Sequence, residues 1–236
     1  MRDLQAVLFD LDDTLHDDTR AYKSAARRVA RDVAARCGID PEALERAYVA
    51  QAEGFWSNLN DEQLKTKLAG VRLRLWSAAL QAVGVRDEEI AQRCADDYNR
   101  YRRESLELLP GAVELLRDLR QSGRKLGLLT NGFAETHREK IALLQLGDRF
   151  DGIFIADEVG MLKPDPMLFA HACEQLGVAP DATAMVGDRY ERDIRGAHAA
   201  GLYTIWMNVR GDALPPGAPA PDATVPDLSG VRGALL

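Results

Sequence analysis

The sequence predicts an α/β fold, in which a bundle of four helices is inserted into a parallel sheet of strands alternating with helices. Three observations lead to this prediction. Residues 7–14, VLFDLDDT, run from an apolar segment typical of a buried parallel strand into a group of carboxylates. Residues 17–106 show apolar side chains at helical spacing and no convincing strand. From Pro110 onward, strand and helix patterns alternate, which indicates crossover connections within a parallel sheet.

The elements follow in order along the chain. The first strand is expected at residues 6–9. Helices are then expected at 19–37, 41–56, 61–83 and 87–106, with glycines between them and with Pro41 and Asp87 as helix-starting residues. After Pro110, helices are expected at 111–122, 134–146, 166–176 and 191–200. Strands are expected at 125–130, 152–156, 182–187 and 203–206. Residues 214–221 are rich in proline, glycine and alanine and suggest a surface loop.

The helical segment is an insertion, because the first strand must join a sheet whose next strand lies about a hundred residues later. Hinges are expected near residues 15–18 and 108–111. The chain is therefore predicted to form two domains, one from residues 1–16 and 108–236 and the other from residues 17–107.

The composition excludes some classes of function. The chain has 236 residues and a formal charge of −7, which disfavours a nucleic acid polymer as a partner. Three widely spaced cysteines show no metal-binding spacing and suggest reduced thiols and a cytoplasmic location. No apolar run is long enough to span a membrane, and we expect no signal peptide, because the first strand is predicted to begin at residue 6. We expect a monomer or a homodimer.

The most informative chemistry lies at the end of the first strand. Asp10 and Asp12 are two residues apart, and ionised carboxylates after an apolar strand are costly unless a positive charge neutralises them. Mg²⁺ prefers oxygen ligands, and a carboxylate beside it can attack phosphorus. From these residues alone, a strand that ends in an ordinary polar turn remains an alternative.

Three further apolar segments lead to reactive residues, namely Thr130-Asn131-Gly132, Lys163-Pro164 and Gly187-Asp188, with Asp193 five residues beyond. Ligands bind at the carboxyl ends of parallel strands, and these ends share one edge of the sheet. We therefore expect the four segments to form one site. Hydroxyl and amide donors in the second segment suit the oxygens of a transferring phosphoryl group.

With these motifs the chain resembles the haloacid dehalogenase (HAD) superfamily of phosphohydrolases, in the subgroup whose helical cap follows the first motif. The matching pattern is Asp10-x-Asp12-x-Thr14, Thr130-Asn131-Gly132, Lys163-Pro164 and Gly187-Asp188-x4-Asp193. The resemblance implies a Rossmann-like catalytic core, a four-helix cap that closes over the site, and Mg²⁺ as cofactor. It also implies hydrolysis of a small phosphorylated metabolite.

The residues and the resemblance together give each side chain an expected role. Asp10 is the nucleophile that would form an aspartyl-phosphate, and Asp12 is the general acid and then the general base. The expected catalytic residues are Asp10, Asp12, Thr130 and Lys163. The expected phosphate-binding residues are Thr130, Asn131, Gly132 and Lys163. The expected metal-site residues are Asp10, Asp12 through its backbone carbonyl, Asp188 and Asp193, with Glu191 as an alternative to Asp193 as the residue that orients a metal-bound water.

The sequence leaves several alternatives open. The form Thr130-Asn131-Gly132-Phe133 resembles HAD phosphatases that act on nucleoside monophosphates or on N-acylneuraminate 9-phosphate. A phosphomutase is the nearest rival, and a non-catalytic binding module is a more distant one. A dehalogenase is disfavoured because Asp12 supplies an acid that dehalogenases of the superfamily generally lack.

Outside the motifs, most aromatic residues of the helical segment are expected in its core, and Arg72 and Arg74 on its solvated face. His16 and His137 receive no catalytic role.

Overall fold

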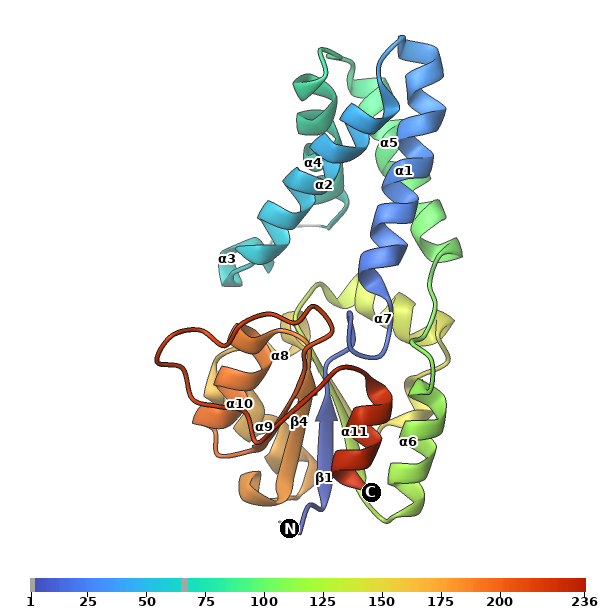
Figure 1. Ribbon diagram of the computed structural model, residues 1–236. Coiled ribbons are helices and arrows are strands. Elements are labelled where there is room, and N and C mark those ends of the chain that lie inside the picture. Colours follow the sequence, from blue (N-terminus) through green and yellow to red (C-terminus); the bar gives the residue numbers. More distant parts are fainter. Residues whose placement is uncertain (1–2, 65–67) are drawn as a thin grey trace. The chain divides into compact units, whose positions relative to one another are not determined.

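The computed structural model describes residues 3–64 and 68–236, and the chain divides into two compact units. One comprises Met1–Asp17 and Leu108–Leu236 and holds the sheet, and the other comprises Asp18–Glu107 and is helical (Figure 1). Each unit has its own core.

Among the described residues, six strands form one parallel sheet in the order β3-β2-β1-β4-β5-β6. They are β1 (Ala6–Phe9), β2 (Lys125–Thr130), β3 (Gly152–Ile155), β4 (Thr183–Gly187), β5 (Tyr203–Met207) and β6 (Ala223–Val225). Phe9 at the end of β1 pairs with Leu128 on one side and Val186 on the other. The strand order changes direction between β1 and β4, and an α/β sheet binds its ligands at the carboxyl ends of the strands at such a point.

Apolar side chains cover both faces of this sheet, as its fully buried central strand requires. On one face, Val7 and Phe9 belong to a core that includes Leu115 of α6 (Ala112–Gln121) and Val231 of α11 (Leu228–Leu235). On the other face, Leu8 belongs to a core that includes residues of α9 (Pro166–Leu176) and α10 (Arg195–Ala199). Short helix α8 (Ala156–Val159) follows β3, and α7 (Ala134–Leu143) follows β2.

The last strand and the last helix were not among the predicted elements. β6 has three residues, and none of them is fully buried, so its apolar signal is weak. Helix α11 carries a recognisable start, because the Asp227 carboxylate accepts hydrogen bonds from the backbone N–H groups of Ser229 and Gly230 at 2.9 and 3.0 Å. Its buried residues Leu228, Val231 and Leu235 recur at helical spacing.

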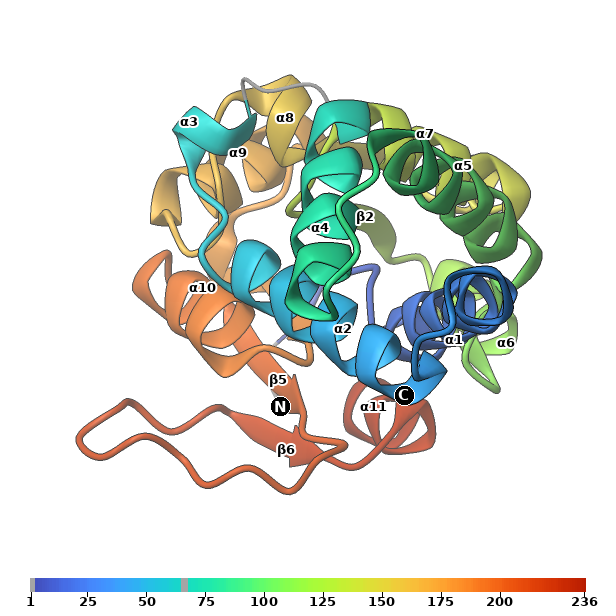
Figure 2. The ribbon, with the colours of Figure 1, turned by 90° about the horizontal axis from the view of Figure 1, so that it is seen from above.

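In the described part of the helical unit, four long helices and one short one form a bundle. They are α1 (Asp18–Cys37), α2 (Pro41–Ser57), α3 (Asp61–Leu64), α4 (Leu68–Ala82) and α5 (Glu88–Glu104). Helix α1 packs on α2 and α5, and α4 packs on the same two, which closes a ring of four helices (Figure 2). The helix expected at 61–83 corresponds to α3 and α4, and its residues 65–67 lie outside the described part of the chain.

Trp76 and Tyr98 lie in the centre of this bundle with Tyr48, as expected, whereas Tyr22, Phe55 and Trp56 are only partly buried. Tyr48 and Trp76 stack with ring centroids 3.9 Å apart, and Tyr98 lies 5.0 Å from Tyr48. The expectation for Arg72 is wrong, because its side chain is buried, bonds to the Asn99 side chain and lies over the Tyr98 ring. A guanidinium can occupy such a place when its donors find acceptors and its flat face meets an aromatic ring.

Within residues 3–64 and 68–236, the helices are all too short or too polar to cross a membrane.

Candidate active site

Asp10 is the residue directly after β1, the central strand of the sheet. Its backbone N–H donates to the carbonyl of Val186 on the neighbouring strand β4 at 3.0 Å, which fixes the start of the loop. Its carboxylate lies at the carboxyl edge of the sheet and is almost completely buried. A buried carboxylate needs a positive partner, and Lys163 supplies one.

The ammonium group of Lys163 is held by three acceptors. Its Nζ lies 2.6 Å from Asp10 Oδ1, 2.7 Å from Asp193 Oδ1 and 2.9 Å from the carbonyl oxygen of Leu129. Burial by itself lowers the pKa of Lys163, but the attraction of Asp10 and Asp193 raises it above its ordinary value. The lysine is therefore a permanent cation at the bottom of the site.

Asn131 connects the loop after β2 to the loop that carries this lysine. Its side-chain Nδ2 donates to the carbonyl of Lys163 at 2.9 Å, and the N–H of Lys163 donates to Asn131 Oδ1 at 2.8 Å. The amide thus fixes the backbone at the lysine, and one of its two N–H bonds remains for another acceptor.

Gly132 makes a close approach to α7 that a larger residue would prevent. Its φ of +150° disfavours other residues, and a methyl group on its Cα would overlap with the ring of His137. Thr130, at the end of β2, is buried. The three residues of this segment lie at the same edge of the sheet as Asp10, because β1 and β2 are parallel neighbours.

Asp188 and Asp193 come from the segment after β4, where the expected helix at 191–200 takes a different form. It begins with a π-helical turn, Tyr190–Ile194, and continues as α10. The Arg189 N–H donates to Asp193 Oδ2 at 2.9 Å, and the side chain of Asp193 lies so close to Gly187 that a methyl group there would overlap with it. The wide turn directs Asp193 inward, a use of π-turns that is common at functional sites.

Asp10, Asp188 and Asp193 form a buried acidic cluster, in which one carboxylate oxygen of each lies within 4.8 Å of the others. Burial raises the pKa of Asp10 to about 7, although Lys163 opposes the shift. Burial and the repulsion of Asp193 and Asp10 raise the pKa of Asp188 to about 8. The three carboxylates thus repel one another in a small buried space, and an all-oxygen cluster of this kind fits a hard divalent cation such as Mg²⁺.

Glu191 does not join this cluster. Its carboxylate is exposed and pairs with Arg195 one turn further along at 3.0 Å. Two residues that the sequence did not single out contact Asp188 instead. Arg210 Nη2 lies 3.0 Å from Asp188 Oδ2, and the indole N–H of Trp206 donates to the Asp188 carbonyl at 3.0 Å. Trp206 belongs to the neighbouring strand β5, so only the sheet order could have indicated its contact with Asp188.

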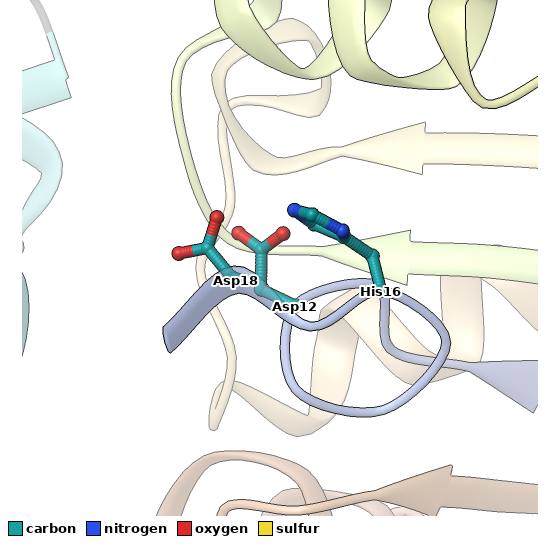
Figure 3. A group of neighbouring side chains, drawn as sticks. All are labelled: Asp12, His16 and Asp18. Atoms are coloured by element: carbon teal, nitrogen blue, oxygen red, sulfur yellow. The ribbon is translucent and has the colours of Figure 1, made fainter. Parts of the chain in front are cut away.

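Asp12 lies in a loop that folds back on itself. The Leu11 carbonyl accepts from the N–H groups of Leu15 and His16 at 2.9 and 3.0 Å, and Asp13 takes the left-handed conformation with φ of +57°. Figure 3 shows the side chains of Asp12 and His16 on this loop, together with Asp18, the first residue of α1.

Lys140 binds the carboxylate of Asp12, whereas Lys163 binds that of Asp10. Lys140 Nζ donates to both oxygens of Asp12 at 2.7 Å, and His137 Nε2 lies 3.4 Å from Asp12 Oδ2. Both partners come from α7 and are buried. Sequence reasoning missed Lys140 and gave His137 no role. The available signal was their spacing of three residues on a helix that starts just after Thr130-Asn131-Gly132.

Comparisons with known proteins identify the family of the chain. A family model described as haloacid dehalogenase-like hydrolase matches residues 4–201. The chain is 35% identical to a phosphoserine phosphatase of Thermus thermophilus, over 95% of this chain and 96% of the relative. It is 33% identical to the N-acylneuraminate-9-phosphatase of Rattus norvegicus, over 92% and 88% of the two chains. The crystal structure of the HAD hydrolase YfnB from Bacillus subtilis, bound to magnesium, superposes with a TM-score of 0.79 at 26% identity, covering 98% of both chains.

The family match spans most of the chain, and the relatives align over nearly their whole length. The chain therefore belongs to the haloacid dehalogenase-like hydrolase family and is a phosphatase.

Proposed function

We propose that this phosphatase transfers the phosphoryl group of a small metabolite to Asp10 and then to water. The observation that carries the proposal is the position of the Asp10 carboxylate. It lies at the carboxyl end of the central strand, 2.6 Å from a buried ammonium and within the acidic cluster. A carboxylate so placed can act as a nucleophile toward phosphorus once cations neutralise the incoming negative charge.

In the first half of the reaction, an oxygen of Asp10 bonds to phosphorus while the bond to the leaving oxygen breaks. Asp12, in its protonated form, gives its proton to that oxygen, so that an alcohol departs and an aspartyl-phosphate remains. Lys163 and the donors of Thr130, Asn131 and Gly132 bind the phosphoryl oxygens. Their place at one edge of the sheet supports this role, because preorganised donors stabilise the charge that develops in the transition state.

In the second half, the Asp12 carboxylate takes a proton from water. The oxygen of that water bonds to phosphorus as the bond from Asp10 to phosphorus breaks. Inorganic phosphate leaves, Asp10 is again a carboxylate, and Asp12 again holds a proton for the next cycle. One residue thus serves as acid and base in turn.

The residues that would hold Mg²⁺ are Asp10 and Asp188 by their carboxylates and Asp12 by its backbone carbonyl, with Asp193 orienting a metal-bound water. The raised pKa values of Asp10 and Asp188 support this assignment, because burial and the repulsion between the carboxylates disfavour their charged forms, which a bound cation would favour. When bound, the ion neutralises the cluster and polarises the phosphoryl oxygens.

A small phosphorylated metabolite is the proposed substrate class. Relatives of similar identity are named for phosphoserine and for N-acylneuraminate 9-phosphate, so identity does not choose between these substrates. The net charge of −7 also disfavours polyanionic substrates at low salt. We expect higher kcat/KM on at least one amino acid phosphate, sugar phosphate or nucleoside monophosphate than on phosphopeptides or 5′-phosphorylated oligonucleotides.

The test of the reaction is the variant Asp10→Asn, which keeps the shape of the side chain but is a far weaker nucleophile. Phosphate release from p-nitrophenyl phosphate with Mg²⁺ should become undetectable, while the thermal unfolding curve stays cooperative. Asp181→Asn, which alters an exposed carboxylate, is the matched control and should keep full activity. Activity of Asp10→Asn within tenfold of the unmodified protein would disprove the assignment.

A further inference from the structure

The contact between Lys140 and Asp12 has a geometry that fixes the orientation of a carboxylate. A single ammonium donates to both carboxylate oxygens, each at 2.7 Å, so Asp12 can neither rotate nor swing away without losing at least one of these bonds. The Lys140 side chain is 3% exposed, whereas that of Asp12 is 28% exposed. The lysine therefore contacts Asp12 from the protein interior, while the Asp12 side chain stays partly exposed.

His137 supports the same contact from one helical turn earlier. Its Nδ1 lies 3.1 Å from the Phe133 carbonyl, and its ring packs against Gly132, so the ring itself is held in place. Its Nε2 lies 3.4 Å from Asp12 Oδ2. The segment that begins with the phosphate-binding loop thus also carries the residues that hold Asp12.

Stability alone does not explain a lysine in this position. A buried ion pair gains about as much from its attraction as it loses by leaving water, so an apolar pair of the same volume is often as stable. Catalysis, in contrast, depends steeply on position, and a displacement of about 1 Å can lower a rate by roughly a hundredfold. A device that fixes Asp12 therefore has a benefit in the reaction that it lacks in folding.

We propose that Lys140 is a positioning residue, which holds the Asp12 carboxylate where it can take the proton of the attacking water. This inference rests on the acid–base role proposed above for Asp12. Lys140 acts through Asp12, and the Asp10 carboxylate has its own ammonium in Lys163. Loss of Lys140 should therefore slow hydrolysis of the aspartyl-phosphate more than its formation.

The variant Lys140→Met tests this with p-nitrophenyl phosphate, whose good leaving group needs little help from an acid. We expect kcat to fall by roughly ten- to a hundredfold and KM to fall with it, so that kcat/KM changes by less than about threefold. Rapid quench and intact mass should show an added phosphoryl group that accumulates in the variant. Arg138→Met, which removes an exposed ion pair with Glu158 on the same helix, should leave both constants unchanged.

The double variant Asp12→Ala/Lys140→Met separates positioning from structure. It removes both charges of the pair, so it should fold even where Lys140→Met alone does not. If Lys140 acts through Asp12, the double variant should lose its phosphoryl group from Asp10 within about twofold of the rate of Asp12→Ala.

Two results would overturn the inference: a further large loss in the double variant, or a Lys140→Met protein that is folded and releases phosphate at the normal kcat. If Asp12→Ala itself hydrolyses the phosphoenzyme at the normal rate, the proposed role of Asp12 fails, and the positioning role of Lys140 fails with it.

Discussion

Asp10 and Asp12 are two residues apart in the sequence, yet the fold places them in opposite surroundings. Asp10 is buried among other carboxylates and shares the ammonium of Lys163 with Asp193. Asp12 is more than a quarter exposed, and the ammonium of Lys140 donates to both of its oxygens. Lys140 belongs to α7, and Lys163 lies in the loop between α8 and α9, 23 positions later in the sequence.

The difference shows how one short motif can supply two chemical roles. Around Asp10, the carboxylates of Asp10 and Asp193 share the single ammonium of Lys163. This arrangement suits a site that takes up a further cation and then a phosphoryl group. In the Asp12–Lys140 pair, the carboxylate is held by a buried ammonium and is itself partly exposed, which suits a group that exchanges protons with water. The neighbours, rather than the aspartates themselves, separate the roles.

The largest effect on activity and stability is expected when the lysine of the Asp10–Lys163 pair is removed. Lys163→Met should lower kcat by roughly a thousandfold, because it removes a preorganised cation from the phosphoryl site. It should also lower the free energy of unfolding by about 3 kcal/mol or more, because buried Asp10 and Asp193 lose their ammonium. Activity and urea unfolding measure the two effects.

Lys125→Met is the control for that variant. Lys125 is exposed, and its Nζ donates to the Leu176 carbonyl at 2.6 Å. A single bond of this kind contributes about 1 kcal/mol. A similar loss of stability in both variants would mean that the buried carboxylates do not depend on Lys163.

The two pairs also differ in how far the sequence could predict them. The residues around Asp10 each follow an apolar strand or lie in a loop soon after one, so the rule that parallel strands share a ligand-binding edge was enough to bring them together. No such rule predicts the contact between Lys140 and Asp12. It depends on which face α7 turns toward the Asp12 loop, 128 positions earlier in the sequence. Residue type misleads as well, because Thr136, His137 and Lys140 are polar and yet are buried on the same face of α7 as Ile141.

The fold shows the same limit at a larger scale. Strand positions in the centre of the sheet were predicted to within a residue or two, because long apolar runs need a buried place. The short edge strand β6 and the π-helical turn at Tyr190–Ile194 were missed. Edge strands carry little apolar signal, and the extra residue of a π-turn is set by tertiary contacts such as that of Asp193 with Lys163.

The pH dependence of protein stability tests the surroundings of the acidic cluster that Asp10 forms with Asp188 and Asp193. Burial raises the pKa of Asp188 from 3.8 to about 8, so between these values Asp188 holds its proton in the metal-free folded protein but not in the unfolded chain. The stability that Asp188 contributes is therefore greatest in acid and is lost as the pH rises through about 8. We expect Asp188→Asn to flatten this fall and to be more stable than the unmodified protein at about pH 8 in a chelator.

Excess Mg²⁺ should reverse that order, because the ion binds the folded protein and stabilises it by mass action. The melting temperature of the unmodified protein should rise with Mg²⁺ concentration, while that of Asp188→Asn should change little. Thermal unfolding at several pH values with and without chelator measures both effects. Equal pH slopes in the two proteins would show that Asp188 is not the buried acid described here.

The smallest expected effect on kcat is that of replacing His137, the second residue of α7 that contacts Asp12. A separation of 3.4 Å between its Nε2 and Asp12 Oδ2 is longer than a good hydrogen bond, so the contact contributes less than about 1 kcal/mol. His137→Phe keeps a flat ring against Gly132 and should lower kcat on p-nitrophenyl phosphate by roughly two- to fivefold, less than Lys140→Met. Steady-state kinetics of the two variants side by side give the comparison. If His137→Phe were the more damaging of the two, the histidine rather than the lysine would hold Asp12.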